Sequence, residues 1–126
     1  MKLRRLEDLP ALVQGKKVVL ANGCFDLLHV GHLRYLQHAR TMGDVLVVAI
    51  NSDKSMAMIK EPCGPILDEN ERVSLVSAFR SVDYVVLFDE PDVSRVLEVL
   101  RPAIHAKDRK NHSTRDIIKR ILSTDK

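Results

Sequence analysis

The stretch KVVLANGCFDLLHVGH, residues 17–32, contains a predicted strand, a loop and the start of a helix. Its first five residues, Lys17–Ala21, form a short apolar run after the leading lysine, and the run ends at the turn signal Asn22-Gly23. Beyond the loop, apolar residues recur at helical spacing, which predicts a helix over residues 30–42. The stretch is therefore predicted to be a strand–loop–helix unit.

The same order of elements continues along the chain. Residues 44–50, DVLVVAI, are almost continuously apolar, which is typical of a strand buried on both faces of a parallel sheet. Asp68 and Glu71 have capping-box spacing, so a helix is predicted from there to Phe79. This alternation predicts an α/β fold, with an open parallel sheet flanked by helices. The further predicted elements are strands at residues 84–88 and 103–106 and helices at residues 93–100 and 113–122.

The whole chain, residues 1–126, is predicted to form a single domain. Its length is near the commonest domain size, and the sequence shows no linker, internal repeat or low-complexity segment. Residues 3–13 carry apolar side chains on one side, with Pro10 among them, and are expected to form a helical extension over residues 1–15. Two acidic residues and Pro10 interrupt the apolar positions there, so no signal peptide is expected.

Composition narrows the class of protein. Apolar residues make up 45% of the chain and charged residues 29%, which fits a folded protein rather than a disordered one. No apolar run approaches the ~20 residues of a membrane helix. The two cysteines, Cys24 and Cys63, suit a reducing compartment, so a cytoplasmic protein with no membrane partner is expected. The net charge of +3 fits an anionic small molecule, and the few aromatics give little support for nucleic acid as a partner.

The loop of the first unit carries the residues with chemistry. Ligands of doubly wound sheets gather at the carboxyl ends of the strands, where such loops lie. His29 and His32 stand three residues apart at the helix start, so both imidazoles can reach one ligand. The helix N-terminus favours phosphate, and Gly31 lets the backbone approach closely. The pattern therefore indicates a nucleotide-phosphate site in which the imidazoles stabilise charge on an α-phosphate.

The same residues also have ordinary structural interpretations. Two histidines at this spacing can be structural or solvated, while Asn22 can be a cap, Asp26 a turn residue and Asp53 the cap of a short helix. Cys24 fits a small buried side chain better than a nucleophile. A zinc site needs three or four protein ligands, and the other histidines are scattered, so no metal ligation is expected from the pair. The loop matches neither the dinucleotide fingerprint nor a Walker loop.

The longer stretch NGCFDLLHVGHLRYL closely resembles the signature of the cytidylyltransferase-like nucleotidyltransferases, which carry an H-x-G-H motif at this position. The similarity continues through GDVLVVAINSD and GPILDENERVSLVSAFRSVDYVVLFDE. Within that superfamily the chain looks most like the adenylyltransferase domain of ADP-heptose synthase. The resemblance implies a Rossmann-like fold, a homodimer, and direct, Mg²⁺-assisted transfer of AMP from ATP to a sugar phosphate, D-glycero-β-D-manno-heptose 1-phosphate, with release of pyrophosphate.

The resemblance also implies roles for individual residues. His29 and His32 would hold the phosphates and stabilise the transition state, and Lys60 and Arg72 match family residues placed near the phosphates. Without the motif, Lys60 would be an ordinary loop lysine and Arg72 a solvated helix residue. Ser113 begins a segment like the family's triphosphate-binding S-T-T helix start, and is equally an ordinary N-cap. The residues expected to line the nucleotide site are Asn22, Gly23, Cys24, Phe25, Asp26, Gly31, Asp53, Lys107, Ser113 and Thr114.

Residues 107–113 form a shorter interval than this family usually has. Relatives carry a Gly-Asp turn, further chain and another strand here, and that turn helps to hold the base and the ribose. Base and acceptor therefore stay open, with glycerol-3-phosphate cytidylyltransferase and FAD synthetase as alternatives within the same chemistry. A non-catalytic nucleotide-binding domain is the alternative of another class.

Overall fold

Four strands form the centre of the computed structural model, which describes residues 1–59 and 66–107. These strands are β1 (Val18–Gly23), β2 (Val45–Asn51), β3 (Tyr84–Phe88) and β4 (Ile104–His105). Their order in the sheet is β3-β2-β1-β4, and every pairing is parallel. The predicted α/β fold with a Rossmann-like open parallel sheet is confirmed.

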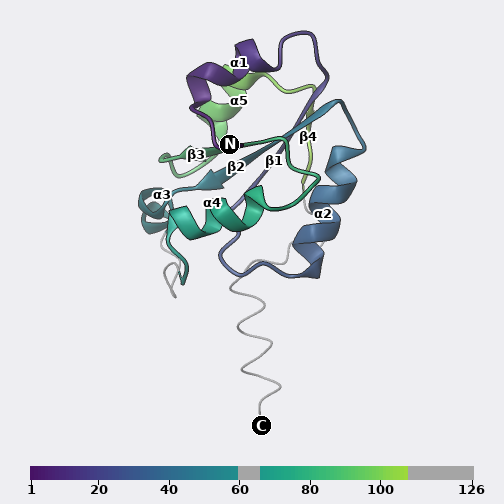
Figure 1. Cartoon of the computed structure of the whole chain (residues 1–126). Coiled ribbons are helices and arrows are strands. Elements are labelled where there is room, and N and C mark those ends of the chain that lie inside the picture. The colour runs from purple at the N-terminus through teal and green to yellow at the C-terminus, as the bar shows by residue number, and fades with distance from the viewer. Residues whose placement is uncertain (60–65, 108–126) are drawn as a thin grey trace.

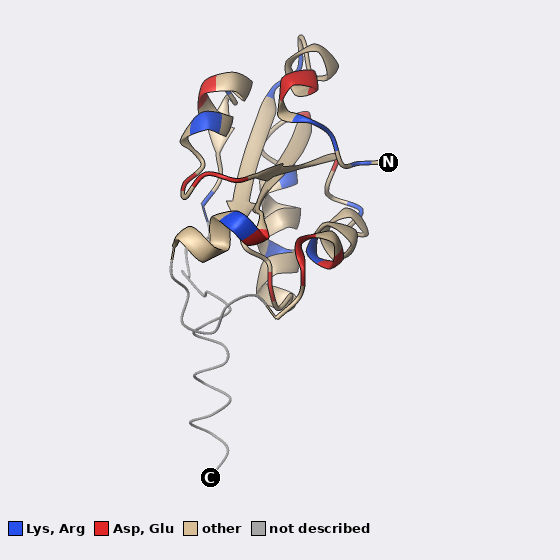
Figure 2. Ribbon diagram, turned by 90° about the vertical axis from the view of Figure 1, so that its left-hand side faces the viewer, with Lys and Arg blue, Asp and Glu red and all other residues tan. Residues whose placement is uncertain are grey.

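Burial on both faces explains why these segments form strands. All seven residues of β2 are buried. Within the described part of the chain, the strands carry no Lys, Arg, Asp or Glu, so their ribbons are tan in Figure 2. An apolar strand of this kind is stable where helices cover the sheet from both sides.

Helices cover both faces of the sheet (Figure 1). The helical elements are the 3-10 turn η1 (Leu6–Asp8) and the helices α1 (Leu9–Leu12), α2 (Val30–Arg40), α3 (Asp53–Met58), α4 (Glu69–Ser77) and α5 (Ser94–Leu100). On one face, α2 and α4 pack against the strands through a cluster that contains Leu36 and Val76. On the other face, α1 and α5 pack through a cluster that contains Leu9 and Val96. The core therefore has two halves, separated by the sheet.

The N-terminal segment differs from the helix predicted over residues 3–13. Leu3 forms an isolated parallel bridge with Val85, and Arg4 N donates to Val85 O at 2.8 Å, so the chain begins as an extended segment beside β3. Its helical part is limited to η1 and α1. Pro10 explains this limit, because it is tolerated in the first turn of a helix, where it stands in α1, and not in the interior of a longer one.

Helix α3 was not among the predicted elements, and a short helix entered only as the alternative in which Asp53 is its cap. Asp53 is instead the first helical residue, whereas Ser52 is the N-cap and its Oγ accepts from Ser55 N at 3.1 Å. Six residues are too few to show a helical period in the sequence. The helix predicted over residues 113–122 lies outside the described residues.

Leu36 anchors α2 to the sheet, since its side chain is fully buried. Replacing Leu36 with alanine should lower the free energy of unfolding by about 2–5 kcal/mol, because apolar contacts are lost and a cavity remains. Leu75 on α4 is 44% exposed, and its replacement with alanine should change stability by less than about 0.5 kcal/mol. Urea denaturation of the two variants measures the difference, and equal effects would contradict the packing described.

Candidate active site

The carboxyl ends of β1 and β2 lie at one edge of the sheet, because the strands pair in parallel register up to Gly23 opposite Ile50. From this edge the chain leaves β1 and enters the N-terminus of α2 at the lower end of the molecule in Figure 1. We call residues 24–32 the histidine loop. Open α/β sheets bind ligands at this edge, so the candidate site is built around that loop.

His29 and His32 lie against each other at the start of α2. Their ring centroids are 4.0 Å apart, with an angle of 44° between the ring planes. His29 is the N-cap residue, and its Nδ1 accepts a hydrogen bond from Gly31 N at 3.0 Å. The Nδ1 of His32 accepts from His29 N at 3.3 Å. Each ring therefore satisfies one of the backbone N–H groups that a helix start leaves without an intrahelical partner.

These hydrogen bonds assign the tautomer of both rings. A ring nitrogen that accepts an N–H carries no proton, so a neutral imidazole holds its proton on the other nitrogen. The donor atom of both His29 and His32 is therefore Nε2. The two rings lie side by side, and neutral N–H donors on them can stabilise negative charge on phosphate oxygens, so the arrangement favours charge stabilisation over proton abstraction.

Two glycines make room for aromatic rings of the histidine loop. A Cβ on Gly31 would lie 2.5 Å from Cε1 and 2.8 Å from Nδ1 of His29. A Cβ on Gly23 would lie 3.2 Å from Cε2 of Phe25. The sequence predicts that Gly31 allows the backbone to approach a ligand closely. The structure shows a second requirement for glycine at this position, namely space for the His29 ring.

Phe25 has a left-handed backbone conformation, with a φ of 53°. This region is unfavourable for a bulky L residue. The ring is 3% exposed, and its centroid lies 5.3 Å from that of His32 in an edge-on arrangement. Phe25 was expected to border the nucleotide, and the structure places its ring in the core, beneath His32.

Asp26 is also buried, with 2% of its surface exposed. One carboxylate oxygen accepts from Leu67 N at 2.8 Å, and both accept from Ile66 N, at 3.0 and 2.8 Å. The carboxylate therefore fastens the histidine loop to the segment before α4. The role expected for Asp26 by resemblance, orienting the site, stays a prediction.

Arg72 is fully buried, although the resemblance places it near the phosphates. Its Nη1 donates to Cys24 O at 2.8 Å and to Asn51 O at 2.6 Å. Its Nε donates to Leu67 O at 3.2 Å, and its Nη2 forms an ion pair with Asp53 at 2.8 Å. The guanidinium thus joins the histidine loop, the end of β2, the start of α3 and the segment before α4.

Asp53 connects α3 to α4 as well. Asp53 N donates to Glu69 Oε1 at 3.0 Å, and Glu69 N donates to Asp53 Oδ2 at 3.2 Å. Each carboxylate therefore accepts a backbone N–H in the first turn of the other helix, where negative charge is favourable. Asp53 was expected in the nucleotide site, and the structure shows its carboxylate bound to Arg72 and to the backbone of Glu69.

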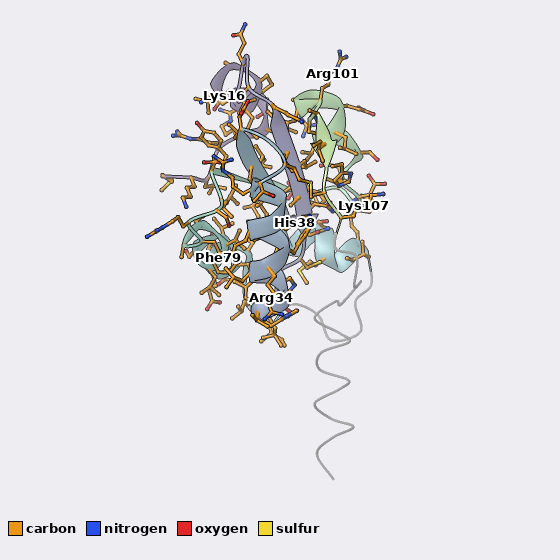
Figure 3. The ribbon with its side chains drawn as sticks, turned by 90° about the vertical axis from the view of Figure 1, so that its right-hand side faces the viewer. Lys16, Arg34, His38, Phe79, Arg101 and Lys107 are labelled. Carbon is orange, nitrogen blue, oxygen red and sulfur yellow. The ribbon has the colours of Figure 1, made fainter. Side chains whose placement is uncertain are left out.

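Sequence reasoning missed His105, which the structure brings to the edge of the site. Its Nε2 lies 2.7 Å from Oδ1 of Asn22, the residue before the last one of β1. Tyr35 on α2 donates to Ala106 O at 2.7 Å, so α2 is hydrogen-bonded to the residue that follows β4. Lys107 follows as an exposed residue, on the opposite side of α2 from Phe79 in Figure 3. A signal was available, because His105 stands near the carboxyl end of a predicted strand.

The pKa of His105 predicts a pH dependence of stability. Burial, and secondarily the charge of Lys107, lower this pKa from its ordinary value of 6.5. The folded protein then binds a proton at His105 less readily than the unfolded chain does, so its contribution is complete above pH 6.5 and is lost as the pH falls below it.

His105→Gln should therefore lose less stability than the natural protein when the pH falls below 6.5. Urea denaturation on both sides of this pH measures the difference. His38→Gln is the matched control, because His38 is exposed on α2. Equal pH slopes for His105→Gln and the natural protein would contradict the prediction.

Some predicted site residues lie outside the described ranges. These are Lys60, Ser113 and Thr114, so their roles stay predictions. Among residues 1–59 and 66–107, no group of three or more His, Cys, Asp or Glu could hold a metal ion. In the same ranges, none of the helices has the length and apolar character needed to cross a membrane.

Comparison with known proteins identifies the class that this fold and loop define. The cytidylyltransferase-like family matches residues 20–122. The chain belongs to this family, as the H-x-G-H motif predicted.

Individual relatives show which kinds of protein the chain is similar to within this family. The chain is 46% identical over 111 residues to the bifunctional protein HldE of Geobacter metallireducens, an alignment that covers 84% of this chain and 23% of the relative. It is 52% identical over 94 residues to HldE of Citrifermentans bemidjiense, covering 75% and 19%. The chain thus spans about a quarter or less of these relatives. A crystal structure of the lipopolysaccharide core biosynthesis protein from Thermoplasma volcanium GSS1 is 30% identical, with a TM-score of 0.66, covering 87% of this chain and 89% of that one.

Proposed function

We propose that this chain is an adenylyltransferase that transfers AMP from ATP to D-glycero-β-D-manno-heptose 1-phosphate and releases pyrophosphate. The observation that carries the proposal is the pair of adjacent imidazoles of His29 and His32, whose Nδ1 atoms both accept backbone N–H groups, at the carboxyl edge of the sheet. Similarity to several HldE proteins and to a lipopolysaccharide core biosynthesis protein supports a heptose phosphate as the acceptor.

The reaction is a direct displacement. A phosphate oxygen of the acceptor attacks the α-phosphorus of ATP, the bond to the bridging oxygen breaks, and pyrophosphate leaves with the electron pair. The acceptor phosphate is already ionised at neutral pH, so catalysis consists mainly of positioning and charge stabilisation. His29 and His32 donate to the α-phosphate oxygens, where negative charge increases in the transition state.

Mg²⁺ is proposed to arrive with the nucleotide. Both carboxylate oxygens of Asp26 accept backbone N–H groups, so this carboxylate is already used inside the protein. Mg²⁺ in nucleotide sites is commonly held mainly by the substrate phosphates, and it neutralises part of the triphosphate charge when bound. The described residues fit this arrangement better than a metal cage built by the protein.

Most remaining assignments rest on the family resemblance. Lys60, Ser113 and Thr114 are proposed on this ground to contact the triphosphate, and the backbone around Cys24 to border the nucleotide. Lys107 is proposed to contact phosphate because of its charge. A cytoplasmic homodimer is proposed on the ground of the resemblance. Light scattering coupled to size-exclusion chromatography measures the oligomeric state.

The proposed activity has a direct test. The protein is incubated with ATP, Mg²⁺ and heptose 1-phosphate, and release of pyrophosphate is measured, with a full-length HldE relative as the positive control. Release that requires both ATP and the acceptor is the expected result. CTP with glycerol 3-phosphate, and ATP with FMN, test the alternative activities. ATP binding by calorimetry without turnover on any acceptor would contradict the proposal and favour a non-catalytic nucleotide-binding domain.

A further inference from the structure

The buried guanidinium of Arg72 holds together segments that are far apart in the sequence. It donates four hydrogen bonds, to three backbone carbonyls and to Asp53. Burying a charged group costs free energy unless it is paired and hydrogen-bonded, and here several site segments supply the acceptors. Because the side chain has no exposed surface, its donors face the protein interior rather than a ligand.

One acceptor of Arg72 belongs to a strained part of the histidine loop. The Cys24 carbonyl is part of the peptide group that joins Cys24 to Phe25, and Phe25 has the left-handed φ of 53°. Such a conformation persists for a bulky residue when the surroundings determine it. Arg72 fixes the peptide group before Phe25, and the carboxylate of Asp26 fixes the chain after it through Ile66 N and Leu67 N.

The position of Phe25 in turn affects His32. The Phe25 ring is buried beneath His32, with the two ring centroids 5.3 Å apart. His32 contacts His29 and accepts the His29 N–H, so a shift of Phe25 would move both imidazoles. A continuous chain of contacts thus runs from Arg72 through the turn at Phe25 to the two Nε2–H donors.

We propose that Arg72 is a positioning residue, which holds the left-handed turn at Phe25 and thereby places His29 and His32, and does not itself contact the nucleotide. The proposal deepens the proposed function and rests on it for the consequence on turnover. The effect of Arg72 on the positions of the two imidazoles in the ligand-free protein does not depend on that function.

The test compares Arg72→Lys with Arg80→Lys, a matched control because Arg80 is an exposed arginine just after α4. A lysine ammonium cannot span the acceptors that the planar guanidinium reaches. The ¹⁵N and ¹H resonances of the His29 and His32 imidazoles, recorded without any ligand, should shift in Arg72→Lys and stay unchanged in Arg80→Lys. Turnover of Arg72→Lys should fall about 100-fold, with a much smaller change in the Kd for ATP, since the reacting groups are misplaced rather than removed.

An arginine that contacts phosphate would behave differently. Arg72→Lys would then leave the ligand-free imidazole resonances unchanged and would weaken ATP binding, and this result overturns the proposal. Asp26→Asn loosens the other side of the turn, because an amide offers one acceptor oxygen where two now accept N–H groups. Asp26→Asn should shift the same imidazole resonances. If Arg72→Lys does not fold, Asp26→Asn takes its place in the test, and the absence of a shift in its imidazole resonances then overturns the proposal. The proposal is also overturned if Arg72→Lys folds and keeps its imidazole resonances unchanged while those of Asp26→Asn shift. Failure of the natural protein to release pyrophosphate would contradict the proposed function alone.

Discussion

Replacing His32 with asparagine should lower kcat for nucleotidyl transfer by about 10²- to 10³-fold, the usual effect of removing one donor to developing oxyanion charge. The asparagine Oδ1 can take the place of Nδ1 and accept the His29 N–H, so the helix cap is retained. The variant lacks a donor at the position of Nε2. Because the lost hydrogen bond strengthens in the transition state, KM should change much less than kcat. Steady-state pyrophosphate release measures both constants.

Two further variants separate this effect from loss of structure. His32→Gln places an amide N–H near the position of Nε2 and should retain more turnover than His32→Asn. His38→Asn makes the same change of side chain at an exposed position higher on α2 in Figure 3, and should keep natural turnover. If His32→Asn unfolds at the same urea concentration as the natural protein and also keeps its kcat, the assigned role of His32 is wrong.

The sheet could be predicted because its physical cause is present in the sequence. A segment such as DVLVVAI is stable where both of its faces are covered, and β2 is indeed buried along its whole length. The capping box at Asp68 and Glu71 was predicted from the spacing and is present in α4. The helix predicted over residues 3–13 was too long, because pairing of Leu3 with β3 outweighed the local apolar pattern and Pro10 limits how far a helix can extend.

The candidate site could be predicted in part. The adjacency of His29 and His32 was predicted from helical spacing, and the structure produces it through the capping box of α2, in which His29 is the N-cap and His32 the N3 residue. The hydrogen bonds of Asp26 could not be predicted, because its partners are backbone N–H groups about forty residues away, and backbone groups leave no pattern of side chains in the sequence. Arg72 was treated as a solvated residue or a phosphate contact. A signal was present, since Arg72 stands four residues before Val76 and both lie on the buried side of α4.

The replacement of Gly31 with alanine should reduce kcat by roughly 100-fold through His29, although alanine is the better helix former. A Cβ at this position would lie 2.5 Å from Cε1 of the His29 ring, so the imidazole has to turn away. The hydrogen bond from Gly31 N to His29 Nδ1 is then lost, and Nε2 leaves the position from which it is proposed to donate to the α-phosphate. Stability should change little, because the gain in helix propensity offsets the lost cap hydrogen bond.

A double-mutant cycle tests whether the effect of Gly31→Ala passes through the imidazole. In a His29→Ala background there is no ring for the new Cβ to displace, so Gly31→Ala should cause no further loss of turnover, and the two effects should be strongly non-additive. Val30→Ala, at a 57% exposed position of the same helical turn, is the control for a general change at the helix start. If instead Gly31 serves chiefly the close approach of the backbone to phosphate, Gly31→Ala lowers activity equally with and without the His29 ring. Pyrophosphate release by the four proteins of the cycle therefore distinguishes space for the imidazole from space for the ligand.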